Sequence, residues 1–93
     1  MFQRVLKQMR EKVRHRQYVM TLHAEEEMSD DDFGIFDVER SLLAGEIVER
    51  QKDTVTGGWK YLVKGQTVSG DKMITVAKIS PTGKLVIITV YRL

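Results

Sequence analysis

The 93-residue sequence contains no cysteine, only one proline and no long apolar run. The lack of cysteine excludes a disulfide framework, a thiolate zinc site and a cysteine nucleophile. No apolar stretch approaches the roughly 20 residues that a membrane-spanning helix needs. Charges interrupt the segment from Met1 to Arg16, which is not typical of a secretory signal. We therefore expect a cytoplasmic protein that has no membrane partner.

Motifs for metals and cofactors are also missing. Gly57-Gly58 lacks the Lys-Ser/Thr that follows the glycines of a phosphate-binding loop. His15 and His23 are too far apart in the sequence for a metal-ligand pair. The run Asp30-Asp31-Asp32 lacks the glycine and distal glutamate of a calcium loop, so a solvated turn is the better interpretation. We expect no metal and no cofactor.

Length and composition indicate one small globular domain over residues 1–93. The sequence is 42% hydrophobic and 30% charged, which argues against wholesale disorder. The formal net charge of +2 hides a segregated pattern, because residues 1–22 carry +5, residues 23–54 carry −8 and residues 55–93 carry +5. This pattern predicts separate acidic and basic surfaces, although solvated helix faces would also account for each charge run.

Hydrophobic spacing predicts helices in the first half of the chain and strands in the second. An amphipathic helix is expected from Phe2 to Arg14, and Gly45 is expected as the C′ residue of the third helix. The run Tyr18–Leu22 favours a strand or an extended lead-in. The other predicted helices are His23–Met28 and Ile35–Leu43, with polar residues 29–32 outside both. The predicted strands are Glu46–Arg50, Trp59–Gly65, Met73–Ile79 and Leu85–Tyr91.

Two turn signals connect the last three strands. Gly70-Asp71 marks one hairpin, and Ser80-Pro81-Thr82-Gly83 has the proline and glycine that a type I turn prefers. Consecutive hairpins make an antiparallel meander, and the last strand, apolar on both faces, is expected in its centre. The predicted fold class is α+β, with N-terminal helices packed on a four-stranded antiparallel sheet and residues 1–14 as an added amphipathic helix.

Polar residues on the predicted sheet are candidates for phosphate or base binding. Alternation places Trp59 and Tyr61 on one face of their strand and Lys60 on the other. Cations on a sheet surface can stabilise phosphate charge, and an aromatic ring can stack on an unpaired base. The alternative is a solvated lysine and two core aromatics; alternation favours the core for Trp59 and leaves Lys60 open. His23 is either an acid–base group or a local capping residue.

Beyond these patterns, the sequence resembles a bacterial family catalogued as domain-of-unknown-function family 4258. The similarity runs from about His23 to Tyr91 and leaves the first helix outside. It rests on the order and spacing of short motifs. These motifs are His23-Ala24-x-x-x-Met28, Phe33, Asp37-Val38-Glu39, Gly45-Glu46-Ile47-Val48-Glu49, Tyr61-Leu62-Val63-x-Gly65, Ile74-Thr75-Val76 and Ile87-Ile88-Thr89-Val90-Tyr91.

The resemblance implies a RelE-like toxin fold and a metal-independent endoribonuclease that cleaves messenger RNA. It also implies a cognate antitoxin partner, of the zinc-finger type often encoded beside such proteins. Matching positions make His23, Lys60 and Tyr91 the catalytic candidates, with Lys60 beside a matched position. The substrate-binding candidates are Tyr61, Lys78, Thr89 and Arg92.

Two positions depart from the family pattern. Relatives commonly carry arginine where this sequence has Glu27 and Asp31. If those arginines bind phosphate, the exchange replaces attraction by repulsion. The rival hypothesis is therefore a non-catalytic binding module whose acidic central segment docks a basic protein. A third interpretation is a structural protein that self-associates through its basic first helix.

Overall fold

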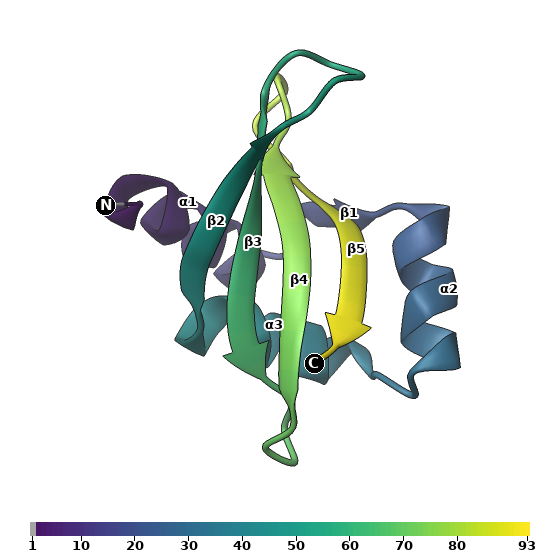
Figure 1. Ribbon diagram of the computed structural model, residues 1–93. Helices are drawn as coiled ribbons and strands as arrows, with labels where there is room; N and C mark the ends of the chain where they lie inside the picture. Colours follow the sequence, from purple (N-terminus) through teal and green to yellow (C-terminus); the bar gives the residue numbers. More distant parts are fainter. Residues whose placement is uncertain (1) are drawn as a thin grey trace.

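The computed structural model describes residues 2–93 as three helices and a five-stranded sheet (Figure 1). The chain therefore has the predicted α+β class, with helix and strand bounds close to those expected from hydrophobic spacing. The helices are α1 (Gln3–Arg14), α2 (Leu22–Asp30) and α3 (Ile35–Ala44). The strands are β1 (Tyr18–Met20), β2 (Glu46–Lys52), β3 (Trp59–Gln66), β4 (Lys72–Ile79) and β5 (Leu85–Arg92).

The prediction of four antiparallel strands is wrong, because β1 joins the sheet as a fifth, parallel strand. The strand order is β1-β5-β4-β3-β2, and Tyr18, Val19 and Met20 pair with Leu85, Val86 and Ile87. Strands β2 to β5 form the expected antiparallel meander. A three-residue strand is too short to show alternation, and its partner lies more than sixty residues away in the sequence.

One face of the sheet carries the core, and the other has no helix over it. In Figure 1, α1 and α3 lie behind the sheet, while α2 lies beside β5. The core side chains come from α1 and α3 and from alternate strand positions, as the periodicities of helix and strand require. They include Met9, Val38, Leu42, Val63, Met73, Ala77, Leu85, Ile87 and Val90, all fully buried.

The second helix is longer than predicted and closes the edge of β5. Thr21 is its N-cap: its Oγ1 accepts a hydrogen bond from the Ala24 amide at 3.1 Å and donates one to the Ile88 carbonyl at 2.9 Å. The helix continues through Ser29 and Asp30, which we expected to lie outside it. Met28 packs against the core, so tertiary contact overrides the weak helix propensity of these polar residues.

The end of α3 packs directly on β3 because two glycines face each other there. A Cβ atom on Gly45 would lie 2.3 Å from the Ser41 carbonyl oxygen, and one on Gly65 would lie 2.6 Å from the same atom. Gly45 has an ordinary φ of −86°, so its expected role as a left-handed C′ residue is wrong. The glycine is required by close approach.

Trp59 does not fill the core, which corrects the interpretation from alternation. Its side chain is 42% exposed at the end of β3. The guanidinium of Arg50 lies 4.1 Å from the ring centroid, and the Lys52 ammonium lies 5.2 Å from it. Strand-end position therefore outweighs alternation for this residue.

Within residues 2–93, no helix is long and apolar enough to cross a membrane.

Candidate functional site on the open face of the sheet

The uncovered face of the sheet presents its side chains in three cross-strand rows. The residue pairing aligns one residue each from β3, β4 and β5 in two rows; in the third it pairs Lys78 with Val86, and Lys60 precedes Tyr61, which pairs with Ala77. Successive rows lie two residues, about 7 Å, apart along the strands. The rows are Lys60-Lys78-Val86, Leu62-Val76-Thr89 and Lys64-Ile74-Tyr91. The lysines thus lie in the two outer rows, on either side of Leu62, Val76 and Thr89.

A hollow of about 280 Å³ lies at the end of this face nearest the 53–58 loop. Lys60 and Lys78 are the cations in its lining, and within residues 2–93 the Lys60 ammonium forms no ion pair. Thr21 lines the same hollow, two residues before His23. The remaining lining residues are Asp53, Val55, Val86 and Ile88. An unpaired cation in a partly apolar hollow is suited to binding an anionic group.

Lys78 lines the hollow too, but its charge is already matched. Its ammonium lies 2.6 Å from Asp53 Oδ2 and donates to Thr56 Oγ1 at 3.4 Å. Asp53 also accepts hydrogen bonds from the Val55 amide and the Thr56 hydroxyl. The hydrogen bond from Lys78 and these local donors hold the pKa of Asp53 well below its ordinary value. The pair therefore fixes the 53–58 loop against the sheet.

His23 lies on the side of α2 that faces the edge of β5. Its Nε2 is 3.2 Å from Glu27 Oε1, one helical turn further on. The same Oε1 accepts a hydrogen bond from the Val90 amide of β5 at 3.2 Å. Glu27 thus satisfies an edge amide and orients the imidazole. Its carboxylate, which seemed unfavourable for RNA in the sequence, has a local structural function.

The structure separates the other predicted residues. Tyr61 lies on the helix-covered face, where its ring packs edge-on against Phe2 at a centroid distance of 5.9 Å. Arg92 is also on that side: it pairs with Asp71 at 2.8 Å, donates to the Asp31 carbonyl and lies over the Phe33 ring. Neither side chain is near Lys60.

Thr89 and Tyr91 share the open face with Lys60 but lie in other rows. Thr89 is opposite Val76 in the central row, and Tyr91 is opposite Ile74 in the last. Tyr91 is therefore two rows, about 13 Å, along the strands and two strands, about 10 Å, across from Lys60. The structure brings Lys60 and Lys78 together beside the start of α2, and it leaves Tyr91 at the other end.

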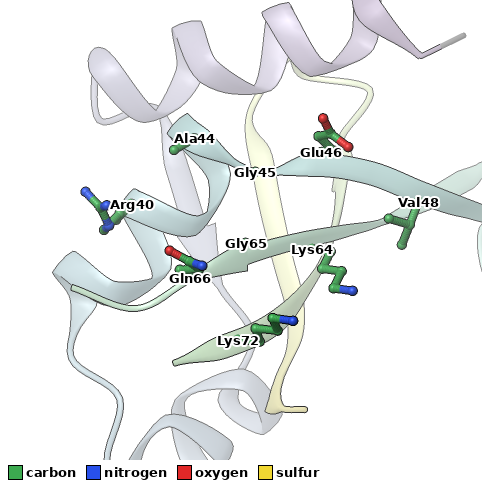
Figure 2. A pocket seen from close by; sticks show the side chains of 9 residues that line it. All are labelled: Arg40, Ala44, Gly45, Glu46, Val48, Lys64, Gly65, Gln66 and Lys72. Atoms are coloured by element: carbon green, nitrogen blue, oxygen red, sulfur yellow. The ribbon is translucent and has the colours of Figure 1, made fainter. Parts of the chain in front are cut away.

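A larger hollow, of about 380 Å³, lies at that other end of the sheet, between the last turn of α3 and strands β2 to β4 (Figure 2). We call it the α3 cleft. Sequence reasoning missed it, because its residues come from four elements and show no motif. The residues that line it are Arg40, Ala44, Gly45, Glu46, Val48, Lys64, Gly65, Gln66 and Lys72.

Sequence reasoning also missed Thr21 as a residue of the first hollow. Its only signal in the sequence was the N-cap preference of threonine.

Comparison with known proteins identifies the family but no individual relative. The model for Domain of unknown function (DUF4258) matches residues 20–92. The chain belongs to this family. The match covers α2, α3 and strands β2 to β5, and it leaves α1 outside, as the sequence motifs predicted. Neither the curated proteins nor the solved structures contain a significant match.

Proposed function

We propose that this DUF4258 protein is a metal-independent endoribonuclease that cleaves messenger RNA, of the kind that RelE-like toxins represent in toxin–antitoxin pairs. One observation carries the proposal: the open face has an unpaired lysine, Lys60, in a hollow beside the start of α2. At that start His23 is exposed and oriented by Glu27. Phosphodiester cleavage without a metal requires an acid–base group and a cation, and we assign these two roles to His23 and Lys60.

The reaction is an internal transesterification. His23 accepts the proton of an RNA 2′-hydroxyl, and the 2′-oxygen forms a bond to the adjacent phosphorus. The bond from phosphorus to the 5′-oxygen breaks, and this oxygen takes a proton from solvent, which leaves a 2′,3′-cyclic phosphate and a 5′-hydroxyl. Glu27 stabilises the imidazolium that forms, and Lys60 stabilises the charge on the non-bridging phosphate oxygens.

The acidic helix α2 is the surface we assign to the antitoxin. Glu25 and Glu26 are exposed, and neither forms an ion pair with another residue of the described chain. A basic partner, such as a zinc-finger antitoxin, would find complementary charge there. Because α2 begins at the hollow, a protein bound to it would also obstruct RNA.

The test is expression of the protein alone, followed by incubation of purified protein with RNA in the presence of EDTA. The wild type is expected to arrest growth and to cleave RNA despite the chelator. His23→Ala is expected to lower the cleavage rate about 100-fold or more, the contribution of one acid–base group. Lys60→Ala is expected to cause a loss of similar size through the missing charge stabilisation.

His15 provides a matched control for His23. It is equally exposed and forms the same i,i+4 contact, with Glu11 at 3.5 Å, but as the C-cap residue of α1. His15→Ala should leave cleavage unchanged, as should Lys7→Ala on the exposed side of α1. Equal loss of cleavage in His15→Ala and His23→Ala would refute the assignment of His23.

Intact RNA and normal growth with the wild type would favour the alternative, a non-catalytic module that docks a basic protein through the acidic segment.

A further inference from the structure

The α3 cleft combines three cations with one acid. Lys64 and Lys72 extend from neighbouring strands on the same side of the sheet, and Arg40 borders the cleft from α3 with its guanidinium pointing away from the two lysines (Figure 2). The single acid, Glu46, points away from the two lysines (Figure 2). Within residues 2–93, neither Arg40, Lys64 nor Lys72 forms an ion pair. The cleft therefore has uncompensated positive charge.

The adjoining helix end does not cancel this charge. The C-terminal carbonyls of a helix carry partial negative charge, which would weaken anion binding. Here Arg10 of α1 donates to the Gly45 carbonyl at 2.8 Å and to the Leu42 carbonyl at 3.4 Å. A partly buried guanidinium thus covers the end of α3 from the side opposite the lysines, and it adds a further positive charge nearby.

The position of the cleft relative to Lys60 indicates the size of its ligand. Lys60 and Lys64 lie on the same face of β3, four residues or about 13 Å apart. An extended polyanion can contact both side chains at once. Ile74 and Val76 lie between them and are only 4% and 7% exposed, so neighbouring side chains cover this part of β4. Tyr91 lies beside Ile74 and offers an aromatic ring.

We propose that the α3 cleft is a second phosphate-binding subsite, which holds a single-stranded RNA that runs along the open face from Lys60 to Lys64, Lys72 and Arg40. Phosphate contacts match the lysines and a base contact matches Tyr91, since bases stack on aromatic rings while cations follow the backbone. An acidic peptide would use the cations but not the ring. This inference rests on the proposed function only for RNA as substrate, because neither His23 nor Lys60 lines the cleft.

The test measures binding apart from cleavage. A fluorescent RNA of about eight nucleotides, within the range of single-strand sites, carries 2′-O-methyl groups so that it cannot be cleaved. The Lys64→Ala/Lys72→Ala double variant is expected to bind it about tenfold more weakly. The slope of log affinity against log salt should fall by about 0.7, the value for one phosphate contact.

The control is Lys7→Ala/Lys84→Ala, which removes the same charge from exposed lysines on α1 and on the β4–β5 turn. Equal weakening by both double variants would overturn the proposal, because it would show an effect of net charge alone. Thermal unfolding at the wild-type midpoint would confirm that the variants are folded. In an NMR titration with the same RNA, the amides of Gly45 and Gly65 are expected to shift; unmoved amides would count against the cleft.

The outcomes separate this proposal from the proposed function. Weakened binding in the Lys64→Ala/Lys72→Ala variant, in a protein that never cleaves RNA, would support the subsite and refute only the nuclease. Cleavage and binding at wild-type level in that variant would refute only the subsite. Tighter binding of polyglutamate than of RNA would overturn RNA as the ligand, and binding of inorganic phosphate as tight as of the oligonucleotide would overturn the extended track.

Discussion

At the scale of single residues, Asp53 illustrates how one carboxylate organises the candidate site. It bonds to the amide of Val55, the hydroxyl of Thr56 and the ammonium of Lys78. Its side chain is 10% exposed and that of Lys78 is 17% exposed, so the pair is shielded from solvent. Lys78 therefore holds the loop over the hollow, and Lys60 remains as the cation available to a ligand.

Asp53→Asn is expected to destabilise the protein at pH 7 and to matter less in acid. The folded state holds the Asp53 pKa below its ordinary value of 3.8. The stabilisation is therefore complete above that value and is lost as the pH falls below it, where the unfolded state binds the extra proton. Urea unfolding at pH 7 and at about pH 3 measures the difference between variant and wild type at each pH.

Asp71→Asn is the matched control, because Asp71 also pairs with a cation, Arg92, but is 58% exposed. Exposed pairs contribute little, so this variant should unfold close to the wild type at both pH values. A loss for Asp53→Asn that is the same size at pH 7 and in acid would contradict the ion-pair explanation.

At the scale of elements, the contact between α3 and β3 forms one wall of the α3 cleft. Ser41 makes this contact close: it is fully buried, its Oγ donates to the Val38 carbonyl at 2.8 Å and it lies 2.9 Å from Thr75 Oγ1. Gly65 faces it without a side chain. The position of the helix end on the strand is thus set by a small residue packed against a glycine.

Gly65→Ala should lower the free energy of unfolding by about 1–3 kcal/mol, the usual cost of overpacking. The new Cβ would lie 2.6 Å from the Ser41 carbonyl oxygen and 2.7 Å from its Cα, both backbone atoms that cannot rotate away. Gly58→Ala is the control, because its nearest neighbour would be a side-chain oxygen at 3.9 Å. Denaturant unfolding that gives equal stabilities for the two variants would refute the close-contact argument.

At the scale of the whole molecule, α1 lies outside the matched family segment but is part of the core. Leu6, Met9 and Val13 are 5%, 0% and 3% exposed, and Met9 and Val13 belong to the same buried cluster as the sheet residues. Arg10 bonds to the end of α3. The helix α1 is thus an addition to the family segment in the sequence, but its buried side chains make it part of the hydrophobic core.

Met9→Ala is expected to cost about 2–5 kcal/mol of unfolding free energy, the range for truncating a buried methionine. Such a loss is a large share of the stability of a small domain, so partial unfolding at ambient temperature is expected. Lys7→Ala, on the exposed side of the same helix, should change stability by no more than about 0.5 kcal/mol. Calorimetry or denaturant unfolding that finds the two variants equal would show that α1 is an appendage.

The sequence by itself determined the class of the fold, the order of α1, α2, α3 and strands β2 to β5, and both hairpin turns. Those features depend on local periodicity and turn chemistry, which a window of ten residues contains. It also determined which side chains share a strand face, and therefore that Lys60 and Lys64 lie on the same face of β3. Only the tertiary structure decided that β1 completes the sheet, that Glu27 closes the edge of β5 and that Lys78 is held by Asp53.

The division has one physical reason. Contacts between residues far apart in the chain depend on which elements meet, and no local pattern contains that information. The candidate site was therefore predicted in part: alternation placed Lys60 on the face opposite Tyr61, but it left the role of Lys60 open and could not show that Tyr61 and Arg92 face the helices. The α3 cleft, assembled from four elements around two glycines, was decided by tertiary packing alone.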